Sequence, residues 1–282
     1  MKKNFHSNSI HNNGYDFKVL QEKYPELEEF LIEKFDKTTV DFTNPKAVKV
    51  LNTALLFAHY NVKFWDFPDE NLCPPIPGRV DYLHYLSDLI GNKETAKVLD
   101  IGTGASCIYP LLGANAFNWD FVATEIDESS LKTAQKIIDD NNLRDKIKLR
   151  KQLEKEHILK GILEEEEKFD VTMCNPPFYK NVQEAVEANQ RKNRNLKIDG
   201  KRNFSGNSNE LWYTGGEKAF LHTYLYESSL FPNASTWFTS LVSKKENVKS
   251  LEASAVKLKA ANFKVINMQQ GNKITRIVCW KF

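Results

Sequence analysis

The chain has 282 residues, of which 41% are hydrophobic and 27% are charged, and its formal net charge is +2. This length allows a substantial buried core, in one large domain or in one domain plus an appendage. The near balance of charge means that any nucleic-acid binding must come from a local basic patch, and no apolar run approaches the roughly 18 residues of a membrane span.

Residues 1–93 are predicted to form a small helical module. Apolar residues at helical spacing predict helices over 25–35 and 47–60, and Thr43 is the expected N-cap of the second helix. The prolines at 74, 75 and 77 predict an extended passage into a further helix over about 79–90. Residues 1–96 contain eleven Lys and Arg against fourteen Asp and Glu, so this module is not broadly basic.

Residues 94–282 alternate between strand-like and helix-like segments. Strands are predicted at 97–102, 120–126, 146–151, 169–174, 235–242, 263–269 and 275–281. Helices are predicted near 107–116, 129–141, 157–166, 216–229 and 246–261, and the acidic run 164–167 is interpreted as the solvated end of one of them. Such alternation predicts an α/β, Rossmann-like domain with a seven-stranded, mostly parallel sheet. The last two strands are too close for a helical crossover, so the sheet should end in an antiparallel strand.

A glycine turn follows the first strand of this region, where Asp100 precedes Gly102, Thr103 and Gly104. Glycines allow close approach of the backbone to a ligand, and the amino end of the following helix favours an anionic group. The spacing departs from the dinucleotide fingerprint, which argues against an NAD or FAD site. Glu125 ends the next strand, 21 residues after Gly104, where an acidic residue meets ribose hydroxyls in Rossmann-like units.

Asn175-Pro176-Pro177-Phe178 directly follows the apolar run 169–174. The motif therefore lies at the carboxyl end of a predicted strand, where open α/β sheets bind ligands. The Asn175 side-chain oxygen can accept one proton of a planar amino group, and a backbone carbonyl of the proline pair can accept the other. The Phe178 ring can stack on an attached base. These four residues are the predicted catalytic motif.

Together these motifs resemble the class I S-adenosylmethionine-dependent methyltransferases that alkylate planar amino nitrogens. The similarity is to the bacterial large-subunit rRNA adenine N6-methyltransferase family and to the related eukaryotic methyltransferase-like sixteen RNA methylases, over about residues 14–282. The stretches that carry it are Asp41-Phe-Thr-Asn-Pro-Lys-Ala-Val-Lys49, Cys73-Pro-Pro-Ile-Pro-Gly-Arg79, Asp100-Ile-Gly-Thr-Gly-Ala-Ser-Cys-Ile-Tyr-Pro-Leu-Leu-Gly113, Met173-Cys-Asn-Pro-Pro-Phe178 and Trp237-Phe-Thr-Ser-Leu-Val-Ser-Lys-Lys-Glu-Asn247. The stretch from His6 to His11 departs from the family, because it lacks basic and proline residues between its two histidines.

The resemblance implies methyl transfer from S-adenosylmethionine to the N6 amino group of one adenine in 23S rRNA, in an immature large ribosomal subunit. Arg79 is then a partner of the cofactor's carboxylate, and Glu125 accepts the ribose hydroxyl protons. The predicted cofactor-binding residues are Arg79, Asp100, Gly102, Thr103, Gly104, Glu125 and Asn175. For the residue that meets the cofactor's adenine, Gln152 and His157 both remain candidates.

A basic substrate loop is predicted at 179–215, between the catalytic motif and the next confident helix. Its basic residues include Arg191, Lys192, Arg194, Lys201 and Arg202, and Trp212 and Tyr213 follow them. Loops this long inside compact domains usually have a function, and basic residues beside aromatic ones can bind phosphates and stack on unpaired bases. We therefore predict that the five named basic residues contact RNA, although a solvated loop without a partner is the simpler alternative.

Other interpretations remain open at this stage. An Asn-Pro-Pro-aromatic motif also serves enzymes that methylate a glutamine N5 of a translation factor, and a noncatalytic RNA-binding assembly factor could keep the fold. Gly215-Gly216-Glu217 either carries a family signature or forms the turn that begins a helix. The four cysteines are scattered without a Cys-x-x-Cys pair, which favours reduced thiols in a cytoplasmic protein and predicts no metal site. We expect a monomer.

Overall fold

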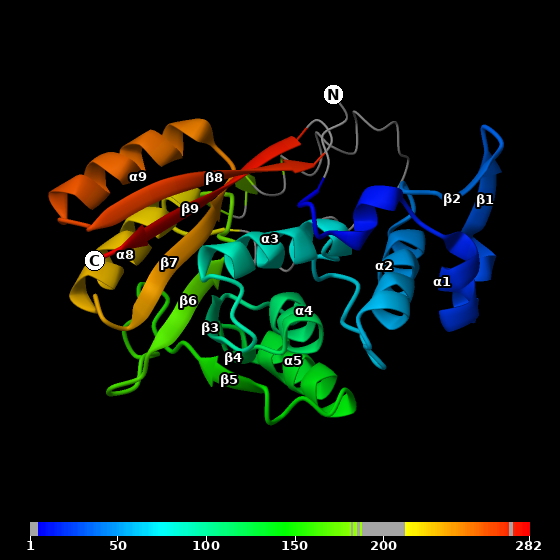
Figure 1. The fold of residues 1–282 in the computed structure, drawn as a ribbon, viewed down its shortest axis with the longest axis horizontal. Helices are drawn as coiled ribbons and strands as arrows, with labels where there is room; N and C mark the ends of the chain where they lie inside the picture. The colour runs from blue at the N-terminus through cyan, green and yellow to red at the C-terminus, as the bar shows by residue number, and fades with distance from the viewer. Residues whose placement is uncertain (1–4, 182, 185–186, 188–211, 271–272) are drawn as a thin grey trace.

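The computed structural model describes residues 5–181, 183–184, 187, 212–270 and 273–282. Seven strands form its main sheet, in the order β5-β4-β3-β6-β7-β9-β8 (Figure 1). Their bounds are β3 (Lys97–Ile101), β4 (Asp120–Glu125), β5 (Ile147–Lys151), β6 (Phe169–Cys174), β7 (Ser235–Val242), β8 (Asn262–Gln270) and β9 (Lys273–Lys281). Strands β3 to β7 pair in parallel, and β9 is antiparallel to both β7 and β8. The predicted α/β fold, with its mostly parallel sheet and terminal antiparallel strand, is confirmed.

The strand order changes direction at β3, with β4 and β5 on one side and β6 and β7 on the other. This is a topological switch point, and ligands bind in the crevice outside the carboxyl ends of the strands at such a point. Strands β3 and β6 are in register, with Ile101 beside Cys174. The glycine turn after β3 and the Asn-Pro-Pro-Phe motif after β6 therefore begin side by side.

Helices cover both faces of the sheet (Figure 1). On one face lie α3 (Ile76–Leu89), α4 (Ile108–Phe117) and α5 (Glu128–Asp140), which share a buried cluster with β3 and β4. On the other face α8 (Gly216–Leu230) and α9 (Lys245–Lys257) pack in a second cluster with the segment 158–162. Helix α4 approaches β4 very closely at Gly113, where an added Cβ would lie 2.3 Å from the Phe121 ring.

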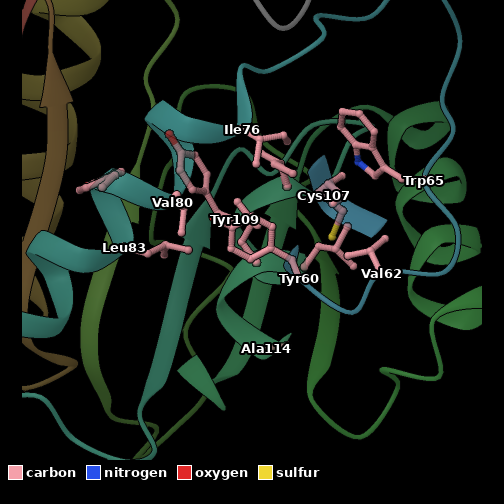
Figure 2. Close-up of a cluster of buried hydrophobic side chains, with 14 of the residues drawn as sticks. Tyr60, Val62, Trp65, Ile76, Val80, Leu83, Cys107, Tyr109 and Ala114 are labelled. Atoms are coloured by element: carbon pink, nitrogen blue, oxygen red, sulfur yellow. The ribbon is translucent and has the colours of Figure 1, made fainter. Parts of the chain in front are cut away.

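The amino-terminal residues form η1 (Ile10–Asn13), α1 (Phe17–Lys23), η2 (Pro25–Phe30), β1 (Leu31–Lys34), β2 (Lys37–Val40) and α2 (Pro45–His59). They share one continuous core with α3 and α4. Figure 2 shows part of this core, in which Tyr60, Val62 and Trp65 lie beside the α3 and α4 side chains. The indole N–H of Trp65 also donates to the Ser106 carbonyl over 2.9 Å. The module is therefore anchored next to the turn that precedes α4.

Two predictions for this region are wrong. Residues 25–35 do not form one continuous helix, because only Pro25–Phe30 are helical, as the 3-10 helix η2, and the chain then enters the β1–β2 hairpin. Phe35 and Asp36 form its tip with φ angles of 53° and 56°, which a right-handed helix cannot include. The N-cap of α2 is Asn44, not Thr43, and its side chain accepts from the backbone N–H groups of Lys46 and Ala47.

The predicted helix over 157–166 is also wrong, since this segment consists of turns. Gly161 and Glu166 have φ angles of 78° and 60°, so the backbone reverses twice where a helix would have to continue. The acidic run 164–167 is therefore not the solvated end of a helix. The Glu167 side chain is 6% exposed and pairs with Lys97 and Arg150.

Candidate functional site

A cleft lies at the carboxyl ends of β3, β4 and β6, with an empty volume of about 1110 Å³ that includes open solvent. Ligand pockets commonly form at such a switch point. The predicted site residues that line it are Arg79, Gly102, Thr103, Gly104, Glu125, Asn175 and Pro177. The structure thus brings together one residue from α3, the glycine turn, the end of β4 and the motif after β6.

The glycine turn is held in a fixed shape by the end of β4. Gly102 and Gly104 have φ angles of 73° and 64°, a left-handed conformation that side chains with a Cβ disfavour. The backbone N–H groups of Gly102 and Thr103 both donate to the Thr124 carbonyl, over 3.0 and 2.9 Å. The turn is therefore formed before any ligand binds.

Glu125 is 8% exposed, and its carboxylate bonds to three backbone N–H groups. One oxygen accepts from Gly104 over 2.9 Å, and the other accepts from Ile126 and Asp127 over 2.8 and 3.1 Å. A carboxylate has about four lone-pair sites, so it can accept several hydrogen bonds at once. Through them Glu125 joins the glycine turn after β3 to the end of β4. The predicted contact of Glu125 with ribose stays a prediction.

Asp100 lies beneath the turn rather than in the cleft lining, with 1% of its surface exposed. Burial raises the pKa of its carboxyl to about 7; the nearby Thr103 hydroxyl lowers it, the Glu125 charge raises it and the Arg79 charge lowers it. Within the described residues neither Asp100 oxygen accepts a hydrogen bond of normal geometry, so the Thr103 hydroxyl is close to the carboxyl without being well aligned. Asp100 is therefore buried next to the turn, and its predicted role in shaping the cofactor site stays a prediction.

Arg79 presents an available positive charge to the cleft. Its guanidinium donates to the Tyr109 hydroxyl over 2.8 Å and lies 5.5 Å from the centre of that ring. Its buried Nε has no hydrogen-bond partner in the described part of the chain, where Arg79 also forms no ion pair. Buried polar atoms without partners are uncommon, so an anionic ligand group fits beside this side chain.

The catalytic motif is only partly in the cleft. Asn175 and Pro177 line it and are half-buried, whereas Pro176 is buried and Phe178 does not belong to the lining. Asn175 thus lies beside the start of the glycine turn, since β3 and β6 are neighbours and end in register. The stacking role of Phe178 and the carbonyl role of Pro176 stay predictions.

The basic residues Arg191, Lys192, Arg194, Lys201 and Arg202 lie outside the described residues. The two flanks of their segment are described, and they meet at the cleft. Tyr179 and Trp212 form a parallel bridge, and the Tyr213 N–H donates to the Tyr179 carbonyl over 3.0 Å. Trp212 and Tyr213 both line the cleft, so the described chain that follows the basic segment begins at the cleft.

Sequence reasoning missed several residues of the cleft, among them Lys155, Ile158 and Phe220. Gln152 and His157, the two candidates for the cofactor's adenine, both line it. The Gln152 amide is already used within the chain, since it donates to the Lys160 carbonyl and accepts from the Glu154 N–H. Nothing in the sequence pattern indicated that Lys155, Ile158 and Phe220 would reach the cleft.

Two classes of site receive no support from the described residues. Within them no group of three or more His, Cys, Asp or Glu side chains could hold a metal ion. No helix in the described part of the chain is both long and apolar enough to cross a bilayer.

Comparison with known proteins gives consistent matches along the whole chain. A family model described as RNA methyltransferase matches residues 1–282. The "Ribosomal RNA large subunit methyltransferase F" of Shewanella sp. (strain W3-18-1) is 47% identical over 298 residues, covering 100% of this chain and 84% of the relative. The protein of the same name from Pseudoalteromonas translucida (strain TAC 125) is 44% identical over 291 residues, covering 98% and 92%.

Solved structures agree with these sequence matches. The hMettl16 catalytic domain in complex with MAT2A 3'UTR hairpin 1 has a TM-score of 0.87 and 31% identity, with coverage of 99% of this chain and 96% of that one. The N-terminal domain of human METTL16 in complex with SAH has a TM-score of 0.81 and 29% identity, with coverage of 99% of each chain. The similarity therefore extends over both the amino-terminal elements and the main sheet.

Proposed function

This chain belongs to the RNA methyltransferase family whose model matches all its residues, and on that premise we propose that it methylates the N6 amino group of one adenine in 23S rRNA, with S-adenosylmethionine as donor. Family membership confirms the resemblance and the methyltransferase activity predicted from the motifs. The observation that supports the finer proposal is the cleft, whose lining includes Asn175, the glycine turn and Glu125. The large-subunit rRNA relatives and the human neighbour with bound SAH support it.

The cofactor fits the groups that the cleft offers. Arg79 would pair with its carboxylate, the turn from Gly102 to Gly104 would lie against it, and Glu125 would accept from its ribose hydroxyls. When bound, S-adenosylmethionine supplies a methyl group activated by a sulfonium. The polar atoms of Arg79 and Thr103 that lack hydrogen-bond partners within the described chain are consistent with a polar ligand at this place.

The chain's own contribution to the reaction is positioning and electrostatics. The amino nitrogen of adenine is a poor nucleophile because its lone pair is delocalised into the ring. The Asn175 oxygen and the Pro176 carbonyl would each accept a hydrogen bond from one N–H of this amino group. These bonds would favour a pyramidal nitrogen aimed at the methyl carbon. A dedicated base is not required, because the N–H proton becomes acidic only as the nitrogen–carbon bond forms and the methyl–sulfur bond breaks; the proton would then leave to solvent and S-adenosylhomocysteine would be the other product.

We propose that RNA contacts come from the basic segment, whose carboxyl-terminal flank at Trp212 and Tyr213 lines the same cleft as Asn175, and from the amino-terminal module. In that module the hairpin tip carries Phe35, which is 87% exposed, between Lys34 and Lys37. An exposed ring beside lysines suits an unpaired base and its phosphates. The target adenine has to be single-stranded or flipped to reach the cleft, which favours an immature large subunit. We place the enzyme in the cytoplasm as a monomer.

A methyl-transfer assay tests this proposal directly. Purified protein is incubated with donor carrying an isotope-labelled methyl group and, separately, with 23S rRNA, precursor large subunits, or translation release factors. Digested products are then analysed by mass spectrometry. We expect label in N6-methyladenosine at one rRNA position. Label in a glutamine of the release factor, and none in RNA, would instead select the glutamine N5 reaction.

A further inference from the structure

We infer that Glu227 is a positioning residue for the cofactor side of the cleft, acting through the segment 157–160 and not by contact with the ligand. The inference rests on the proposed function, because it takes the cleft to be the cofactor site. Glu227 itself does not line the cleft, whereas His157 and Ile158 do. Its effect on the site must therefore pass through the backbone that it holds.

The Glu227 carboxylate lies on α8 with 2% of its surface exposed. One oxygen accepts from three consecutive backbone N–H groups, those of Ile158, Leu159 and Lys160, over 3.0, 2.6 and 3.0 Å. The other oxygen lies 2.9 Å from Nδ1 of His157. Hydrogen bonds to an ionised carboxylate are among the stronger ones in proteins, so four residues are fixed by one side chain.

The segment has few other means of holding this shape. It follows β5 as a series of turns, so helix or sheet hydrogen bonds do not occupy its N–H groups. Ile158 and Leu159 are buried in the α8–α9 cluster, which places their N–H groups out of reach of water. Removing the acceptor would leave buried donors unsatisfied, and such donors carry a large desolvation penalty.

A second set of bonds joins this segment to Glu125. The Gln152 N–H donates to the Glu125 carbonyl over 2.9 Å, and the Gln152 side chain donates to the Lys160 carbonyl over 2.9 Å. The segment is therefore held between Glu125 on one side and Glu227 on the other. If Glu125 meets the ribose, the wall formed by His157 and Ile158 lies where the adjoining base of the cofactor would pack.

Helix α8 also provides a matched control at Glu217. This carboxylate is likewise 2% exposed, and it accepts from the Ser243 and Lys244 N–H groups over 2.7 and 3.4 Å and from the Asn247 side chain over 2.5 Å. The residues that it holds lead into α9 and do not line the cleft. The two glutamates thus share helix, burial and chemistry, and differ in the segment that they fix.

The test compares Glu227→Gln with Glu217→Gln. Calorimetry gives the dissociation constant for S-adenosylhomocysteine, steady-state kinetics give KM and kcat, and hydrogen exchange reports on the backbone amides of 158–160. Glu227→Gln keeps one acceptor oxygen but loses the negative charge and the second oxygen. We expect it to weaken cofactor affinity and raise the KM for the cofactor about tenfold, with faster exchange at 158–160 and a nearly unchanged kcat at saturating cofactor. Glu217→Gln should leave the cofactor KM unchanged even where it lowers the melting temperature.

Equal affinity losses in the two variants would overturn the inference, as would unchanged affinity in Glu227→Gln despite faster exchange at 158–160. If Glu227→Gln does not fold, Glu227→Asp is used, because it keeps the charge on a shorter side chain. Its affinity for S-adenosylhomocysteine should fall by less than about tenfold. Unchanged affinity in Glu227→Asp would also overturn the inference. Failure of the proposed function looks different, since the unmodified protein would then not bind S-adenosylhomocysteine at all.

Discussion

The two walls of the cleft differ in how the chain holds them. The cofactor wall, formed by the glycine turn, Glu125 and the segment 152–160, is joined by many hydrogen bonds to buried backbone groups. The described part of the proposed substrate wall, formed by Asn175, Pro177, Trp212 and Tyr213, is held by fewer bonds: the bridge between Tyr179 and Trp212, the Tyr213 N–H bond to the Tyr179 carbonyl and the Gly216 N–H bond to the Tyr213 carbonyl. The cofactor wall is thus preorganised, whereas the substrate wall adjoins a long basic segment suited to a large partner.

The largest effect is expected at the substrate wall. Asn175→Ala removes the side-chain acceptor for one amino proton of the target base, so kcat should fall by roughly two orders of magnitude or more. Calorimetry should show that S-adenosylhomocysteine still binds, because the glycine turn and Glu125 are untouched; this result would assign Asn175 to the substrate and remove it from the predicted cofactor-binding residues. A variant with full activity would remove Asn175 from the mechanism and make the two walls equivalent.

At the cofactor wall, Glu125→Ala should weaken S-adenosylhomocysteine binding by at least roughly tenfold, because the Gly104, Ile126 and Asp127 N–H groups lose their charged acceptor. Glu128→Gln is the control, since that exposed glutamate follows the same strand and pairs with Lys151 outside the cleft. Calorimetry on both variants should separate them. Equal affinities would show that Glu125 does not shape the cofactor site.

A smaller effect on affinity is expected from the basic segment. Changing Arg191, Lys192 and Arg194 to Gln should weaken RNA binding and reduce the slope of log affinity against log salt by about 2, because three phosphate contacts with a single strand are lost. The control changes three exposed lysines around α9, namely Lys249, Lys257 and Lys259, to Gln. If the two sets change the salt dependence equally, the segment has no special role in binding RNA.

The last expected effect concerns the framework below the glycine turn and is a dependence of stability, not of binding, on pH. Burial raises the pKa of Asp100 from 3.8 to about 7, so the folded protein binds that proton more tightly than the unfolded chain does. The free energy of unfolding should therefore fall as pH rises from about 4 to about 7, relative to Asp100→Asn, which cannot ionise. Urea unfolding of both proteins measures this difference. If the two proteins had parallel profiles of unfolding free energy against pH, ionisation of Asp100 would not destabilise the fold.

Much of the fold could be predicted because buried parallel strands are rich in consecutive apolar residues, as Phe121-Val122-Ala123 of β4 are. The glycine turn could be predicted because only glycine readily adopts the φ angles found at Gly102 and Gly104. The β1–β2 hairpin was missed because the apolar spacing of residues 25–35 also fits a helix. Helix α9 ends before its predicted end, since Lys259 has a φ of 61°.

The features that sequence reasoning could not reach depend on contacts between distant residues. The segment 157–160 has an apolar pattern, but its conformation is set by Glu227, which lies 67 to 69 residues further along the chain from the N–H groups that it accepts. The family resemblance supplied Arg79, whose contact with Tyr109 became visible only in the structure. Spacing along the chain carries no information on such pairings.

The most direct test of the central claim is mass-spectrometric mapping of 23S rRNA modifications in a strain that lacks this gene. We expect one adenine to lose its N6 methyl group, to regain it when the intact gene is restored, and to stay unmethylated when Asn175→Ala is supplied instead. An unchanged set of rRNA methyl groups, or full rescue by Asn175→Ala, would contradict the account.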